Sequence, residues 1–166
     1  MYQIIPDQLP GPQEHWLRFT AEPPAPPVGE GVGGKDVVVV SGYKYYTDTL
    51  LTGSTESDSK ANHYECHIYV GPKWRDLDGV SPVVTVSGFS HYNSDDAEDT
   101  GYGVDLCKWS WEMPQDPSEG RRIKLIVFLH VRGGTDLSIR GLAYHLVARG
   151  SLMLGQTQDF EDHKQL

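Results

Sequence analysis

Two histidines with the potential to bind a metal, His63 and His67, lie four positions apart in the segment HYECH. On a helix they would share a face and could bind one zinc ion, but the glutamate between them is not placed as in the motif H-E-x-x-H. On a strand they would share a face about 13 Å apart, at ~3.3 Å per residue, which is too far for one metal to bridge. We therefore expect structural or exposed histidines here.

Acidic residues are concentrated in the segment NSDDAEDTG. Carboxylate oxygens suit calcium, although the spacing is not that of an EF-hand loop. The segment is interpreted either as a solvated acidic loop or as a calcium site with the candidate ligands Asp95, Asp96 and Asp99. No other cofactor is indicated.

Motifs for catalysis or nucleotide binding are absent from the sequence. It has no G-x-S-x-G nucleophile elbow and no P-loop or dinucleotide fingerprint. Its two cysteines, Cys66 and Cys107, are too far apart in sequence to form a redox motif. The residues favour a protein that is not an enzyme.

Aromatic residues gather where the expected strands run into loops. Tyrosine offers a flat apolar face with a polar edge, which suits both sugar rings and protein interfaces. Alternation along a strand places Tyr43 and Tyr45 on one face and Tyr46 on the other, so at most half of these aromatics can belong to a site. The candidate ligand-binding residues are Tyr43, Tyr45, His91, Tyr92 and Tyr102.

The elements that position these side chains are expected to be strands. Eighteen Gly, eleven Pro and nine Tyr, with long Val-rich runs, are typical of a β-rich protein. Strand-like segments recur between turn signals, which predicts an all-β antiparallel β-sandwich, with a small β-barrel as the alternative. The expected strands are 16–20, 37–46, 63–71, 82–93, 102–114, 121–134 and one bent or two short strands over 135–154. The segment IKLIVFLHV is apolar on both faces, which predicts the central strand.

Three regions are expected along the chain. Residues 1–35 are interpreted as an extended N-terminal arm and a linker rich in Pro and Gly, residues 36–155 as the β-sandwich domain, and residues 156–166 as a polar tail. Within the domain, Val-Ser-Gly-Tyr at 40–43 resembles Val-Ser-Gly-Phe at 86–89, and each is followed by a strand with a cysteine. This similarity indicates either an internal repeat of two strand–loop–strand units or a chance likeness of β-rich segments.

The formal charge of −9 argues against nucleic acid or an anionic membrane as a partner. No apolar run is long enough to span a bilayer, and no signal peptide is visible at the N-terminus. We therefore expect a cytoplasmic protein or a particle assembled in the cytosol, with two buried thiols or one bridge.

The segment from SPVVTVSGF to LSIRGLAYHLVARG, about residues 81–150, resembles the H-type lectin domain. The resemblance implies a small six-stranded antiparallel sandwich that assembles as trimers or hexamers and binds N-acetylgalactosamine. The final strand of that family usually carries tryptophan, where this chain has AYHLVA, so no binding residue is transferred from the family.

Three functions follow in order of preference. The first is a non-enzymatic protein that binds carbohydrate, or a protein ligand, through aromatic-bearing loops as a homo-oligomer. The second is a structural subunit of a capsid, fibre or scaffold, with the N-terminal arm contacting a neighbour. The third is a small β-barrel enzyme.

Overall fold

The computed structural model describes residues 2–7, 11–20, 36–46, 51–53, 60–77, 82–92, 101–113, 115–133, 137–153 and 161–162. These residues contain one short 3₁₀ helix, Pro117–Glu119, and ten strands. None of their helices is long and apolar enough to cross a membrane. The predicted all-β fold is confirmed. The strands are β1 (Gln3–Ile5), β2 (Gln13–Thr20), β3 (Asp36–Tyr45), β4 (Leu51–Thr52), β5 (Ala61–Leu77), β6 (Val83–Tyr92), β7 (Gly101–Trp111), β8 (Arg121–Arg132), β9 (Leu137–Leu152) and β10 (Glu161–Asp162).

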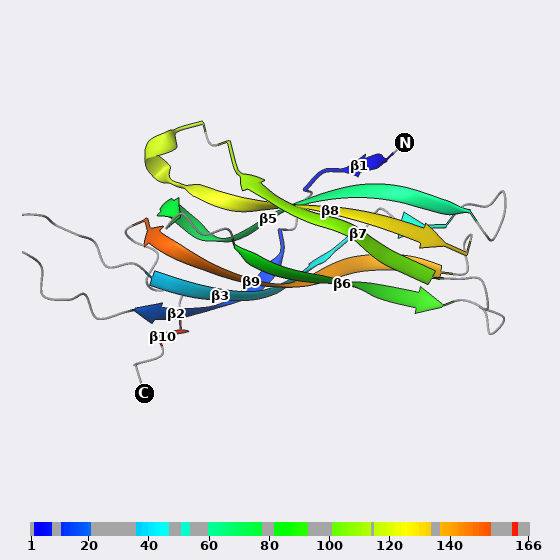
Figure 1. Cartoon of the computed structure of the whole chain (residues 1–166), viewed down its shortest axis with the longest axis horizontal. Helices are drawn as coiled ribbons and strands as arrows, with labels where there is room; N and C mark the ends of the chain where they lie inside the picture. Colours follow the sequence, from blue (N-terminus) through cyan, green and yellow to red (C-terminus); the bar gives the residue numbers. More distant parts are fainter. Residues whose placement is uncertain are drawn as a thin grey trace, which may run out of the picture.

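All ten strands belong to one sheet that curls back on itself as a half-barrel. Figure 1 shows its two halves as layers, with β5, β8 and β7 above and β2, β3, β9 and β6 below. The layers are joined where the end of β5, Trp74–Leu77, pairs with the end of β9, Gly150–Leu152. Most pairs are antiparallel, whereas β1 on β5 and β10 on β2 are parallel.

Strand β8 lies between β5 and the edge strand β7, so it is an interior strand but not the predicted central one; β9, which pairs with β3, β4, β5 and β6, has the central position. Its residues alternate in burial, and the inward set is fully buried: Ile123, Leu125, Val127, Leu129 and Val131. The other face of β8, which includes Ile126 and Phe128, is only half-buried. The apolar run is therefore an interior strand of the sheet that is fully buried on one face only.

The N-terminal residues contribute two strands to the sheet in place of the expected extended arm. Strand β1 pairs with β5 and inserts Ile5 into the core, and β2 pairs with β3 along its whole length. Asp7 follows β1, and its Oδ1 lies 3.2 Å from the Nζ atom of Lys44, a side chain that is 1% exposed. A buried ammonium is costly without a counter-ion, so this pair ties the N-terminal segment to the interior. The linker 21–35 and most of the expected tail lie outside the described residues.

Strand β5 runs on past Gly71 and Pro72, where the sequence had predicted its end. Gly71 has a φ of +73°, which glycine adopts without strain. The pairing with β8 is irregular between Val70 and Trp74 and then resumes. The Gly71 N–H donates to both carboxylate oxygens of Glu14, at 2.8 and 3.1 Å, so the irregularity is held in place by β2.

The two Val-Ser-Gly segments flank the same strand, β9. Gly42 of β3 lies opposite Tyr144, and Gly88 of β6 lies opposite Leu142. The cysteines of the strands that follow, Cys66 and Cys107, both lie opposite Val127 of β8 and are free thiols. Two strand spacings of about 4.8 Å separate them, more than the ~7 Å within which Cα atoms can be bridged.

Candidate functional site

A groove of about 540 Å³ crosses the outer face of the layer formed by β2, β3, β9 and β6. Each of the four strands contributes three consecutive residues to its lining: 13–15, 41–43, 143–145 and 85–87. The groove is therefore built by the register of the sheet, from segments far apart in the sequence.

The outward side chains of the groove form two rows across the strands. One row is Gln13, Tyr43, Ala143 and Ser87; the other is His15, Ser41, His145 and Thr85. Three of these outward side chains, those of Ser41, Ala143 and Ser87, are small. Hydroxyl, amide and imidazole groups thus surround one aromatic ring.

The aromatic member of the groove, Tyr43, is held by two neighbours. Its hydroxyl donates to the Oε1 atom of Gln13. Its ring meets that of Tyr45 edge to face, with centroids 5.4 Å apart and an interplanar angle of 83°. Tyr45 is 51% exposed and Tyr46 is buried, which confirms that Tyr43 and Tyr45 share the outer face. A ring so placed offers the flat surface on which a sugar can stack.

Ser41 and His145 lie side by side in the floor of the groove. The Ser41 Oγ atom is 2.9 Å from His145 Nδ1. In a Ser–His pair that performs nucleophilic catalysis, a third group orients the histidine; none of the carboxylates in the described ranges bonds His145. The pair places a hydroxyl oxygen next to an imidazole nitrogen on the outer face of this layer.

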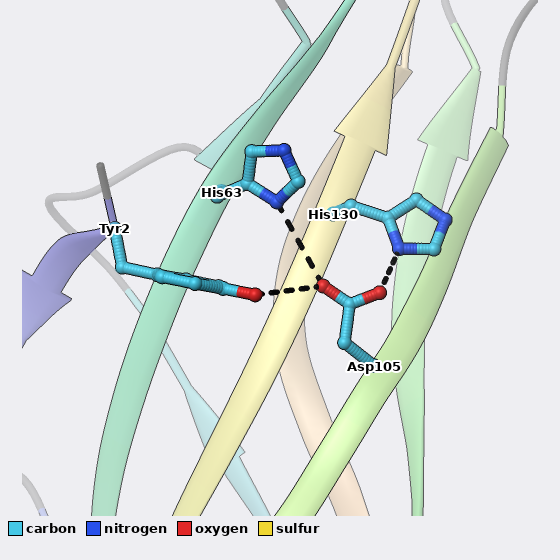
Figure 2. A network of polar contacts seen from close by, with 4 residues as sticks. All are labelled: Tyr2, His63, Asp105 and His130. Atoms are coloured by element: carbon cyan, nitrogen blue, oxygen red, sulfur yellow. Dashed lines mark hydrogen bonds and ion pairs between the residues drawn. The ribbon is translucent and has the colours of Figure 1, made fainter.

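A second polar cluster lies on the outer face of the opposite layer (Figure 2). Asp105 of β7 accepts a hydrogen bond from the hydroxyl of Tyr2, at 3.2 Å from Oδ2, and its Oδ1 bonds Nδ1 of His130. His63 Nδ1 lies 3.7 Å from Oδ2. We call these four residues the Asp105 cluster.

Two local features bring Asp105 to this position. The pairing of β7 with β8 shifts between Val104 and Leu106, and a bulge of this kind re-aims the side chain of the extra residue. His130 lies opposite Gly103, where a Cβ atom would lie 2.3 Å from the imidazole Cε1. The bulge thus turns the carboxylate outward, and the glycine leaves room for the ring that binds it.

The charge of Asp105 is stabilised by its partners. Desolvation raises the pKa of this carboxyl, but the hydrogen bond and charge of His130, with the contributions of Tyr2 and His63, outweigh it and lower the pKa below its usual range. Within the described ranges, no group of three or more His, Cys, Asp or Glu side chains is placed to hold a metal ion. The Tyr2 ring also packs edge-on against the rings of His63 and Phe128, with centroids 5.2 and 5.1 Å apart. These contacts and the bond to Asp105 hold the start of the N-terminal segment against β5, β8 and β7.

His67, the other histidine of the HYECH segment, has a separate partner. Its Nε2 atom is 2.7 Å from Oε1 of Glu65, while His63 belongs to the Asp105 cluster. Neither arrangement is a metal site of the described residues.

Among the predicted ligand residues whose side chains the structure describes, Tyr45 and Tyr102 are not part of the groove lining. Tyr102 bridges β7 to β6: its hydroxyl lies 3.1 Å from the N–H of Gly88, which donates to it, and 3.2 Å from the Gly88 carbonyl, to which it donates. His91 and Tyr92 pair through the backbone with Ser138 and Leu137, and their side chains lie outside the described part of the chain. The calcium candidates Asp95, Asp96 and Asp99 also lie outside it.

An apolar row runs beside the groove on the same outer face. Leu17, Val39, Val147 and Val83 lie opposite one another in β2, β3, β9 and β6. Val83 is 65% exposed and Val147 is 40% exposed. Exposed apolar side chains that adjoin one another in this way are typical of an interaction surface.

Comparisons with known proteins found no relative of this chain. Neither a family model, nor a curated protein, nor a solved structure matches the chain.

Proposed function

We propose that the protein is a non-enzymatic carbohydrate-binding protein and that the groove on β2, β3, β9 and β6 is its binding site. The observation that carries this proposal is the placement of the Tyr43 ring beside polar side chains in a groove of about 540 Å³. Binding sites for small molecules fall within roughly 300 to 1,000 Å³ and combine an apolar surface with a few fixed polar groups.

The chemistry of the groove matches that of an uncharged sugar. A pyranose ring has an apolar face of C–H groups that can stack on Tyr43, and hydroxyls that can bond to neighbouring side chains. Those side chains are Gln13, His15, Ser41, Thr85, Ser87 and His145. No lysine or arginine is among the groove residues, and the chain carries a formal charge of −9, so an anionic glycan is disfavoured.

The resemblance of residues 81–150 to the H-type lectin domain supports the same function. The segment that carries the resemblance holds four of the strands, β6, β7, β8 and β9. The ligand itself is argued from the groove of this chain, because the resemblance transfers no binding residue.

The test is a glycan array probed with the wild-type protein and with Tyr43→Ala. We expect wild-type binding to neutral glycans and a loss of about tenfold or more in affinity for the variant, on the scale of ~1–3 kcal/mol by which a nucleic-acid base stacks on one aromatic ring. Ser110→Ala is a matched control, because Ser110 is exposed on the outer face of the opposite layer. Absence of binding to every neutral glycan would contradict the proposal.

A second candidate function, subunit assembly, is favoured by the apolar row. The row is the same on every copy of the chain, so two copies can cover it by an interface with twofold symmetry. Light scattering should then give a mass above that of the 18.5 kDa chain, and Val147→Glu should return it to the monomer. A monomeric wild-type protein at high concentration would exclude this role for the row.

A further inference from the structure

The groove has a direction, which follows from how the four strands line it. Its lining residues come from the neighbouring strands β2, β3, β9 and β6, so it runs across the strands and not along them. Three strand spacings of about 4.8 Å give a length of ~14 Å from β2 to β6. Along the strand direction the groove covers only three residues of each strand, which span about 7 Å at ~3.3 Å per residue. Its length across the strands is therefore about twice its width.

Both ends of the groove reach an edge of the layer. At one end, β10 pairs with β2 at Leu17 and Arg18, beyond the groove residues 13–15. At the other end, β6 pairs with β9 and, among the described strands, has no ladder on its far side. At the β6 end, the Tyr102 hydroxyl of β7 lies 3.2 Å from the Ser87 Oγ atom, so a chain lying in the groove can continue past the β2 end and meets Tyr102 at the β6 end.

The two ends differ in chemistry. Tyr43, bonded to Gln13, presents an aromatic ring at the end formed by β2 and β3. Thr85 and Ser87 present hydroxyl groups on β6, both residues are exposed, and the Ser87 Oγ atom lies 3.2 Å from the Tyr102 hydroxyl. Ser41 and His145 form a hydrogen-bonded pair between these ends, with an oxygen and a nitrogen 2.9 Å apart.

From this geometry we infer that the groove takes a linear, uncharged oligosaccharide of two or three rings lying across the strands, with one ring on Tyr43 and a distal ring on Thr85 and Ser87. The inference rests on the proposed carbohydrate function and adds the length, the direction and the two ends of the ligand. One pyranose ring would fill only part of the groove and would contact one end only.

The experiment measures affinity against chain length. The probes are the mono- to tetrasaccharides of the cello, malto, chito and manno series, first immobilised on an array and then titrated by calorimetry for the series that binds. For wild-type protein, affinity should rise from one ring to three by about tenfold or more, as hydrogen bonds of ~1 kcal/mol each accumulate, and then level off.

Two variants separate the ends of the groove. Tyr43→Ala should weaken binding at every length. The double variant Thr85→Ala and Ser87→Ala should weaken the trisaccharide more than the monosaccharide and so remove the gain in affinity with chain length. Thr85 and Ser87 are exposed. The Tyr102 hydroxyl keeps its bonds to the Gly88 backbone when the Ser87 hydroxyl is removed. Circular dichroism checks that the fold is retained, and Ser110→Ala serves again as the control.

The outcomes test the length of the ligand separately from the proposal that the groove binds carbohydrate. Equal affinity for one ring and three would overturn the inference while carbohydrate binding stands. A double variant that loses monosaccharide and trisaccharide binding equally would also overturn it. No binding at any length in any series would overturn the proposed function as well.

Discussion

His130 bonds the Asp105 carboxylate through Nδ1, across a sheet position where Gly103 leaves space for the imidazole ring. The same carboxylate accepts a hydrogen bond from Tyr2, which precedes the short strand β1. Because β1 has only three ladder residues, the docking of the N-terminal segment depends on such side-chain contacts at its start and on Asp7 at its end.

Asp105→Asn should loosen the start of β1 without unfolding the protein. The amide cannot keep the charge that the two histidines stabilise, so the bond to Tyr2 weakens. Hydrogen exchange followed by NMR should show faster exchange for the amides of Gln3–Ile5, with the amides of β8 unchanged. Asp116→Asn, in the exposed turn where Asp116 bonds Ser118, is the control. Equal protection of β1 in wild type and Asp105→Asn would show that the cluster does not hold the strand.

Asp7→Ala should destabilise the whole fold. The variant leaves the buried ammonium of Lys44 without the carboxylate 3.2 Å from it, and breaking a buried pair costs about 3–5 kcal/mol. Urea unfolding should show this loss, and Lys44→Met in the Asp7→Ala background should restore much of it, because an apolar side chain suits the site. A loss below about 1 kcal/mol in the single variant, on the scale of an exposed pair, would contradict the buried ion pair.

Gly150→Ala should disrupt the junction between the two layers. A Cβ atom there would lie 2.1 Å from the backbone oxygen of Asp76 and 2.8 Å from the Cα atom of Leu77, so the backbone of β5 must move. We expect a loss of about 1–3 kcal/mol in unfolding free energy, as for an overpacked core. Gly11→Ala is the matched control, because nothing lies within 4 Å of its added Cβ. Equal stability of the two variants would argue against the pairing of β5 with β9.

The thiol of Cys66 should resist modification in the native protein. The pKa of this thiol is raised to about 12, chiefly by burial; the hydrogen bond with Tyr46 opposes the rise and the charge of Glu65 adds to it. The thiolate is therefore scarce at neutral pH. Burial also raises the pKa of Cys107, which is only half-buried. A thiol reagent at pH 8 should therefore modify Cys107 before Cys66, with mass spectrometry identifying the site.

The same shift gives a stability that depends on pH. A thiol whose folded pKa is raised contributes stability that is complete below its unfolded pKa of about 8.5 and is lost as the pH rises toward the folded value. Wild-type protein should lose more stability than Cys66→Ala between pH 8 and pH 11. Parallel curves for the two proteins would contradict the buried thiol.

Much of the fold could be predicted from the sequence, because alternation and turn residues are local signals. They located every long strand of the domain and the shared face of Tyr43 and Tyr45, but not the central position of β9, which depends on the order of strands in the sheet. The continuation of β5 beyond Pro72 was missed because Glu14, 57 residues earlier, supports the irregularity at Gly71. The strands β1 and β2 were underestimated because their partners are also distant in sequence.

The groove could be predicted only in part, since it depends on register. Tyr43 was recognised from its residue type, whereas Ser41, Thr85 and His145 are common polar residues until cross-strand pairing places them in one row. Asp105 was missed for a related reason: the bulge that turns it outward is not visible in the alternation of β7.

The central claim is that the groove on β2, β3, β9 and β6 binds carbohydrate, and NMR mapping of backbone amide shifts during titration with a binding oligosaccharide tests it most directly. We predict shifts concentrated in residues 13–15, 41–43, 85–87 and 143–145, which line the groove, and their loss in Tyr43→Ala. Shifts centred instead on the Asp105 cluster of the opposite layer, or no shifts with any neutral glycan, would contradict the claim.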